Sequence, residues 1–375
     1  MRRSREPVGC DPPRICWVAV AGGKSLERSA LRLGIAGYGM VGKVRHKVAA
    51  AHPRLDVVAV CDQDFDAPTT LDSGLRCWPD YEQLLQEELD ALFVSLPNYL
   101  AAEVTIAALE RGLHVFCEKP PGRDVEDVVR VRECESCHPG LVLMYGFNHR
   151  YHDSVRDALQ IVSSGELGRI VDMRGIYGKS QMIRFDVETN WRIERALAGG
   201  GILLDQGIHM VDLMRLFAGE FTEVHSHVSN AFWGHDVEDN AYALMRTDDG
   251  VVALLHSSAT QWRHRFNLDI TLERGAIVLS GILSSTKSYG AETLTLVFKG
   301  ESDAGDPREQ TTRYNTDNSW SEEVAAFAAA VDGAPISSGS SEDALRTMEL
   351  VYRIYCADPE WAERWNLSLP RRAEV

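Results

Sequence analysis

Residues 31–42 read Leu31-Arg32-Leu33-Gly34-Ile35-Ala36-Gly37-Tyr38-Gly39-Met40-Val41-Gly42. The first six form a short apolar strand, and the last six have the pattern G-x-G-x-x-G before a helical segment at 41–51. Glycines at these positions permit a tight turn, let the backbone approach a pyrophosphate, and let the helix pack on the strand. The helix then directs free N–H groups at the phosphates. An ordinary glycine turn is the alternative, which the surrounding segments make less favourable.

A second strand at 56–61 leads directly into Asp62, which lies 20 residues after Gly42. A carboxylate at this place accepts hydrogen bonds from the ribose hydroxyls of an adenosine. No Arg or Lys occurs between Asp62 and Arg76 to neutralise a 2′-phosphate, so the sequence favours NAD, with NADP as the alternative. We expect cofactor contacts from Gly37, Tyr38, Gly39, Met40, Val41, Gly42 and Asp62.

Strands and helices continue to alternate, with helices expected at 81–88, 99–111 and 125–135 and strands at 91–95, 114–117 and 141–147. This order predicts right-handed crossovers and a parallel sheet, which together make an α/β Rossmann domain over residues 31–150. Further cofactor contacts are expected after two of the strands, from Pro97, Asn98, Glu118 and Lys119. Lys119 stands where a buried strand ends and ligands bind in such sheets. A solvated loop lysine is the alternative.

Beyond residue 150 the apolar residues alternate with period two. Strands are expected at 170–177, 222–229, 240–246, 251–258, 265–272, 276–279 and 293–299. The sequence thus predicts an α+β domain with an open, mostly antiparallel sheet over residues 151–375, serving substrate binding and oligomerisation. Capping boxes at 319–322 and 340–343 predict two C-terminal helices, candidates for packing back on the first domain. Residues 300–318 are polar and expected to be exposed.

Between the first two of those strands lies a glycine run at 199–201, followed by Asp205 and His209 on an apolar helix. Residues four apart project from one face of a helix, and the glycines allow another backbone or a cofactor to come close. A buried structural pair is the alternative for the acid and the histidine. Lys179, Trp191 and Arg192 lie in a basic and aromatic segment that would suit a sugar ring with an anionic attachment, although surface salt bridges are the alternative for its arginines.

Composition excludes several classes of function. The chain has 375 residues, 45% of them hydrophobic, and a formal net charge of -16, which disfavours nucleic acid as a partner. No run of 18 apolar residues is present to cross a membrane. Eight cysteines, some in apolar strands, suit a reduced cytoplasmic protein. Cys134 and Cys137 lack a second ligand pair, so they are interpreted as incidental thiols and no metal site is expected.

The first 30 residues are expected to form a disordered extension. Arg2-Arg3 before the apolar residues 15–21 could mimic an export signal, but that run is short and follows Glu6 and Asp11.

Three motifs together resemble the Gfo/Idh/MocA oxidoreductase family: residues 37–42, Glu118-Lys119-Pro120, and G-G-G-x-x-x-D-x-G-x-H at 199–209. The resemblance covers residues 31–356 and implies hydride transfer between NAD(P) and a hydroxyl or keto carbon of a sugar, cyclitol or nucleotide sugar. It implies that Lys119 is catalytic after a cis bond to Pro120, that His209 is the acid/base and that Asp205 is its companion. The expected substrate contacts are Arg150, Lys179, Trp191, Arg192, Asp205 and His209. Ala101 departs from the family, which commonly has histidine there.

Two other functions stay open at this point. A redox-neutral, NAD-dependent glycosidase or eliminating enzyme of the same family would regenerate its cofactor and form no net NADH. A non-catalytic ligand sensor would keep only the dinucleotide fold, against which the joint presence of Lys119, Asp205 and His209 speaks. The open sheet also suggests a homodimer or homotetramer formed by face packing.

Overall fold

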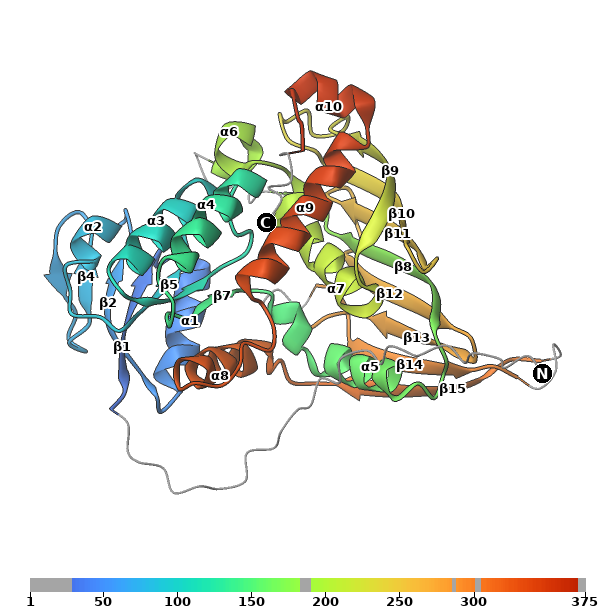
Figure 1. The fold of residues 1–375 in the computed structure, drawn as a ribbon, viewed down its shortest axis with the longest axis horizontal. Helices are drawn as coiled ribbons and strands as arrows, with labels where there is room; N and C mark the ends of the chain where they lie inside the picture. The colour runs from blue at the N-terminus through green and yellow to red at the C-terminus, as the bar shows by residue number, and fades with distance from the viewer. Residues whose placement is uncertain (1–28, 183–189, 285–287, 301–304, 370–375) are drawn as a thin grey trace, which may run out of the picture.

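The computed structural model describes residues 29–182, 190–284, 288–300 and 305–369. The extension expected at 1–30 therefore lies almost wholly outside the described residues. Two sheets, one in each domain, dominate the fold, and helices fill the space between them (Figure 1).

The first sheet has the strand order β3-β4-β2-β1-β5-β6-β7, and all its pairs are parallel except β3 with β4. Its strands are β1 (Leu31–Ala36), β2 (Leu55–Cys61), β3 (Thr69–Thr70), β4 (Arg76–Trp78), β5 (Ala91–Val94), β6 (His114–Cys117) and β7 (Leu143–Tyr145). This order confirms the predicted Rossmann domain. Strands β3 and β4 were not predicted, because strands of two and three residues are too short to show a period.

The helices of this domain are α1 (Met40–Ala50), α2 (Tyr81–Leu84), α3 (Asn98–Glu110) and α4 (Val125–Ser136). The prediction of a helix over 81–88 was too long. After Leu84 the backbone changes to three-residue turns, in which the N–H groups of Gln86 and Glu87 donate to the carbonyls of Gln83 and Leu84.

The second sheet has the order β15-β14-β13-β12-β8-β11-β10-β9, and only β8 and β11 pair in parallel. The strands are β8 (Ile170–Gly178), β9 (Phe221–Ser229), β10 (Asn240–Thr247), β11 (Val252–Ser258), β12 (Arg265–Leu272), β13 (Gly275–Ser280), β14 (Glu292–Phe298) and β15 (Arg308–Tyr314). The predicted open, mostly antiparallel sheet is confirmed. Strand β15 was not foreseen, because it is a polar edge strand exposed on both sides and lacks the apolar alternation of a half-buried strand.

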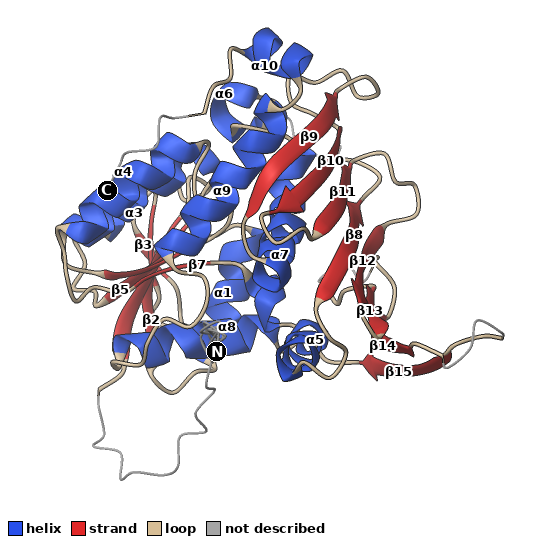
Figure 2. Cartoon of the chain, turned by 45° about the vertical axis from the view of Figure 1, so that its right-hand side comes forward, coloured by secondary structure: helices blue, strands red, loops and turns tan. Residues whose placement is uncertain are grey.

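The remaining helical segments are η1 (Asn148–Tyr151), α5 (Asp153–Ser164), η2 (Trp191–Ile193), α6 (Arg195–Ala198), η3 (Leu203–Gly207), α7 (Ile208–Ala218), α8 (Ser319–Val331), α9 (Ser341–Cys356) and α10 (Pro359–Trp365). Figure 2 shows α5, α7 and α9 on one face of the second sheet, and within the described ranges no helix lies on the other. The capping box at Ser340 and Asp343 is present. The one predicted at Ser319 is absent, because Ser319 hydrogen-bonds Asp317 and Asn318 takes the N-cap position.

The two domains share packed side chains. Phe327 of α8 lies edge-on against Phe93 of β5 and Phe116 of β6, with ring centroids 5.3 and 6.0 Å away. Helix α9 also packs between α4 and α7. These contacts set the end of β6 opposite the start of α7, which is where the predicted catalytic residues lie. None of the helices within the described ranges is long and apolar enough for a membrane span.

Candidate active site

The glycine loop between β1 and α1 has the geometry of a dinucleotide cradle. Gly37 has φ +89°, and a Cβ there would lie 2.4 Å from the carbonyl oxygen of Ser95. A Cβ on Gly42 would lie 1.9 Å from the carbonyl oxygen of Gly37, so the helix can reach the strand only at a glycine. Gly39 faces open space and caps α1 without a side-chain hydrogen bond. The three positions thus match a turn, a helix contact and a free approach for pyrophosphate.

Asp62 follows β2 beside this loop. Its Oδ2 accepts a hydrogen bond of 2.6 Å from the N–H of Tyr38, which fixes the carboxylate against the turn. The residues therefore fit an adenosine ribose and pyrophosphate along the edge of the sheet. Pro97 caps α3 at the same edge, and the Asn98 amide donates to the carbonyl of Ala198 at 2.7 Å. Asn98 is 5% exposed, and its hydrogen bond to Ala198 links the two domains.

The carboxylate of Glu118 binds Arg45 of α1. Arg45 Nε donates to Glu118 Oε1 at 2.6 Å, and its Nη2 lies 2.6 Å from Glu323 of α8. The guanidinium is fully buried, 4.4 Å from the ring centroids of Phe116 and Trp320. The Glu118 side chain thus anchors the segment before Lys119, which corrects its expected role as a cofactor ligand.

Lys119 lies at the end of β6, and its peptide bond to Pro120 is cis, as the resemblance implied. Its Nζ donates a hydrogen bond to the backbone carbonyl oxygen of Asp205 across the domain junction. Burial lowers the pKa of Lys119, and the charges of Lys179 and Arg192 lower it further, against the opposing effect of Asp205 and Glu118. The alternative of a solvated loop lysine is wrong.

The carboxylate of Asp205 lies close to two cationic side chains of the site. Its Oδ2 lies 3.1 Å from Lys179 Nζ, and its Oδ1 lies 3.6 Å from Arg192 Nε. Burial favours the neutral acid, but Lys179, Lys119 and Arg192 together outweigh burial and hold the pKa of Asp205 below its usual range. Asp205 is therefore an anion whose described side-chain partners are lysine and arginine, and it does not form the isolated pair with His209 that was the alternative.

The helix that carries Asp205 and His209 begins with a π-turn, η3, before it becomes α7. An uninterrupted α-helix was expected, and single π-turns of this kind occur often at functional sites. Gly199 and Gly201 precede it, where added Cβ atoms would lie 1.9 and 2.1 Å from the carbonyl oxygens of Arg123 and Glu238. The glycine run therefore serves close approach of backbone rather than of a cofactor.

Glu238 fixes the start of this helix. The fully buried carboxylate accepts hydrogen bonds from the N–H groups of Gly201 and Leu203 at 2.7 and 2.9 Å, and from the Tyr355 hydroxyl at 2.7 Å. An anion at a helix N-terminus satisfies its unpaired N–H groups and complements the helix dipole. Sequence reasoning missed Glu238, because a single glutamate in a loop gives no signal of what it will bind.

His209 is 5% exposed and stacks on His149 of η1, with ring centroids 3.7 Å apart and planes 12° apart. His149 Nδ1 lies 3.2 Å from Asn148 Oδ1 and its Nε2 lies 3.1 Å from the Tyr177 hydroxyl. An amide oxygen can only accept and a tyrosine hydroxyl can donate, so these partners select the neutral tautomer with hydrogen on Nδ1. The sequence around His149 was dense in polar groups, but nothing in it indicated the stack.

Both histidines resist protonation. Burial places the pKa of His209 well below its ordinary value, and the positive charge of Lys119 adds to this effect. Burial and His209 do the same to the pKa of His149. At neutral pH, His209 is therefore a neutral base. Its Nδ1 is enclosed and has no hydrogen-bond partner within the described ranges.

Not every expected substrate residue joins this group. Arg192 reaches Asp205 and lies 4.4 Å from the Trp191 ring centroid, so that pair stands at the site. Arg150 instead binds Asp212 through two hydrogen bonds of 2.6 and 2.7 Å and lies 3.1 Å from Asp343. With a side chain only 6% exposed, Arg150 ties η1 to α7 and α9. Its expected contact with substrate is corrected to a structural role.

No cluster of residues suited to a metal ion occurs within the described ranges. Cys134 and Cys137 are free thiols there, and Cys134 Sγ lies 3.8 Å from His138 Nδ1.

Two parts of the chain match sequence families of protein domains. Residues 31–147 match the family described as "Oxidoreductase family, NAD-binding Rossmann fold", and residues 155–278 match the "GFO/IDH/MocA C-terminal domain". The 1,5-anhydro-D-fructose reductase of Ensifer adhaerens is 30% identical over 267 residues, or 68% of this chain and 73% of that protein. The D-xylose 1-dehydrogenase (NADP(+)) 2 of Haloferax volcanii is 27% identical over 86% of this chain and 95% of that protein.

Levoglucosan dehydrogenase is similar in both sequence and structure. The protein of Pseudarthrobacter phenanthrenivorans is 30% identical over 187 residues, and this match spans 50% of the present chain and 45% of that one. A solved structure of levoglucosan dehydrogenase in complex with NADH superposes with a TM-score of 0.76 over 89% of this chain and 98% of that chain, at 21% identity. At that identity the superposition establishes the shared fold.

Proposed function

Because this chain belongs to the Gfo/Idh/MocA oxidoreductase family, we propose that it is an NAD-dependent dehydrogenase that oxidises a hydroxyl of a sugar, cyclitol or nucleotide sugar at Lys119 and His209. One observation carries the assignment of residues: the domain junction sets Lys119 of the first domain against the carbonyl of Asp205 of the second. Family relatives named as sugar and inositol dehydrogenases support the substrate class.

The glycine loop and Asp62 would hold NAD, whose nicotinamide accepts the hydride when it is bound. NADP stays the alternative. Oxidation of an alcohol also releases the hydroxyl proton, and the protein must supply a base for it. His209 takes that proton at Nε2, since its Nδ1 is enclosed. The His149 stack holds the imidazole plane in place.

Lys119 donates a hydrogen bond to the substrate oxygen and stabilises the negative charge that develops there. A lowered pKa suits a lysine that shares a proton during the reaction. Asp205 holds Lys179 and Arg192 at the mouth of the site, where these two cations and Trp191 bind the other polar groups of the substrate. The anion of Asp205 also offsets the repulsion among the three positively charged groups, Lys119, Lys179 and Arg192.

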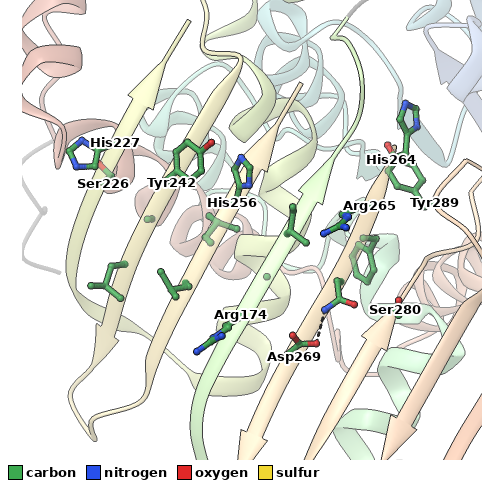
Figure 3. Close-up of a pocket in the computed structure, with 18 of the residues that line it drawn as sticks. Arg174, Ser226, His227, Tyr242, His256, His264, Arg265, Asp269, Ser280 and Tyr289 are labelled. Atoms are coloured by element: carbon green, nitrogen blue, oxygen red, sulfur yellow. Dashed lines mark hydrogen bonds between the residues drawn. The ribbon is translucent and has the colours of Figure 1, made fainter. Parts of the chain in front are cut away.

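We further infer that the chain self-associates through the bare face of the second sheet. Figure 3 shows polar and aromatic side chains across this face, among them Tyr242, His256 and Arg265. They line a shallow hollow of about 1260 Å³, and Lys119 is not among its lining residues. Leu244 and Leu254 face each other across β10 and β11 and are 45% and 47% exposed. Such an exposed apolar patch marks an interface, and we propose a homodimer or homotetramer.

We also propose a cytoplasmic location, which six free cysteines within the described ranges support.

The function is tested with a panel of sugars, cyclitols and nucleotide sugars incubated with NAD or NADP, while the reduced nicotinamide is followed by absorbance. Net NADH from at least one substrate is the expected result. Cleavage of a glycoside without net NADH would favour the redox-neutral glycosidase. Binding of NAD with no reaction of any substrate would favour the ligand sensor and overturn the proposal.

A further inference from the structure

Several loops of the second domain meet at one end of its sheet. Strand β8 ends at Gly178, β11 runs parallel to it and ends at Ser258, and the antiparallel β12 starts at Arg265. The loops after β8 and between β11 and β12 are therefore neighbours. Hydrogen bonds join them, since Lys179 N–H donates to Ser258 O at 2.9 Å and Gln261 N–H donates to Lys179 O at 3.0 Å. The β11–β12 loop thus contacts the residue that binds Asp205.

Two large aromatic side chains are exposed at this end. Phe232, in the loop between β9 and β10, is 58% exposed, and Trp262, in the loop between β11 and β12, is 66% exposed. Their ring centroids are 5.4 Å apart, and the Phe232 ring also lies 4.9 Å from that of Trp233 beneath it. We call Phe232 and Trp262 the aromatic platform.

Hydrogen bonds hold the loop that carries Phe232 in place. The N–H groups of Phe232 and Trp233 both donate to Asp239 Oδ2, at 2.9 and 3.0 Å, and Asp239 is 2% exposed. The indole N–H of Trp233 donates to the carbonyl of Ala259 at 2.8 Å and so ties the two loops together. Rings that are fixed before binding lose little conformational entropy when a ligand stacks on them.

A small apolar cluster links the loop of the platform to the candidate active site. Trp233 and Ile193 pack together against a small cluster whose buried members are Met182, Ile202, Val237 and Ala259. Ile193 directly follows Arg192, whose Nε lies 3.6 Å from Asp205. A ligand that starts at Asp205 and extends past Arg192 would therefore reach the platform next.

We propose that the aromatic platform binds the second ring of a glycoside whose first ring lies at Lys119 and His209. This inference rests on the proposed function. The C–H faces of a sugar ring are apolar and stack on aromatic faces, while its hydroxyls lie at the rim, where Gln261 and Arg263 flank Trp262. The size of the platform also favours a small ligand. Phe and Trp bury about 150–250 Å² each, whereas a stable protein interface takes about 800 Å² from each partner.

The test is calorimetric binding of two probes, methyl β-D-glucoside and cellobiose, to the full chain in the presence of NADH. We expect the wild type to bind cellobiose about tenfold more tightly than the single-ring probe, which corresponds to the strength of one good stacking contact. Trp262→Ala should remove this preference and leave binding of methyl β-D-glucoside unchanged. Trp262→Phe keeps a ring and should retain most of the preference, whereas Trp262→Leu should not.

Equal binding of the two probes by the wild type, or binding of neither, overturns the proposal. An unchanged preference in Trp262→Ala overturns it as well. Leu71→Ala, at another exposed apolar side chain, is the matched control and should behave as the wild type. If Trp262→Ala changes the sedimentation coefficient, the platform is a contact between subunits and the proposal is wrong.

The same samples separate this inference from the proposed function when NAD replaces NADH and reduced nicotinamide is followed. A preference for cellobiose with no oxidation of any sugar in the panel would retain the platform and reject the dehydrogenase. Oxidation of methyl β-D-glucoside without a preference for cellobiose would do the reverse.

Discussion

The domain junction and the bare sheet face are both rich in polar side chains, yet they differ in how those side chains are arranged. At the junction, His209 is buried and Lys119 and Asp205 are partly buried, the three come from both domains, and Lys119 lowers the pKa values of the other two. On the sheet face, Tyr242 and His256 stack at 4.1 Å from adjacent strands, next to exposed leucines. Partly buried side chains of opposite charge suit the junction for chemistry. On the sheet face, every second residue of neighbouring strands points outward, which suits a flat surface for binding a partner.

The largest expected effect is at the junction. Lys119→Met should lower kcat by about 10²–10⁴-fold, because it removes the donor to the substrate oxygen. Steady-state kinetics on a substrate from the panel measures this. Lys47→Met, at an exposed lysine of α1, is the matched control and should retain activity. Full turnover by Lys119→Met would show that the junction is no more a catalytic site than the sheet face.

Substitution of Arg150 tests whether the stability of the fold depends on the buried charges near the junction. Arg150→Met leaves Asp212 buried without its partner and should lower the free energy of unfolding by about 3–5 kcal/mol, measured by denaturant titration. Arg169→Met breaks an exposed ion pair with Glu273 and should change stability little. Equal effects of the two variants would contradict the corrected, structural role of Arg150.

The sheet face is tested by Leu254→Asp, which places a charge opposite Leu244. Desolvating that charge should weaken self-association at least tenfold, as measured by analytical ultracentrifugation, and kcat should stay unchanged. Leu71→Asp, at an exposed leucine of the first domain, should change neither quantity. A wild-type chain that sediments as a monomer would remove the proposed role of this face.

The smallest effect concerns pH. A base must be unprotonated, so oxidation should be constant near pH 7 and fall only as the pH drops through the lowered pKa of His209. Lys119→Met removes a positive charge, so the pKa of His209 should rise, yet stay below about 6.5 because burial is the larger cause. NMR titration measures it, with His209→Asn to assign the signal. A lower pKa of His209 in the Lys119→Met variant would contradict the proposed electrostatic effect of Lys119 on His209.

Much of the fold followed from local sequence patterns. The glycine loop, the strand before Lys119 and the period-two strands each have a pattern that depends on nearby residues, so their element types could be predicted. The π-turn at Asp205, the short α2 and the polar edge strand β15 could not. Each of these depends on backbone hydrogen bonds or on an edge position that a side-chain pattern does not record.

The candidate site divides in the same way. By itself the sequence predicted that Lys119, Asp205 and His209 belong together, because two of the three ordered motifs carry them. Only the tertiary structure decided that Asp205 binds Lys179 and Arg192, that His149 stacks on His209, and that Arg150 and Glu118 are anchors. These contacts join residues that are far apart in the chain: Lys179 and Asp205 are 26 positions apart, Arg150 and Asp212 are 62 apart, and Arg45 and Glu118 are 73 apart. Contacts of that kind depend on how the two domains close, which no local pattern specifies.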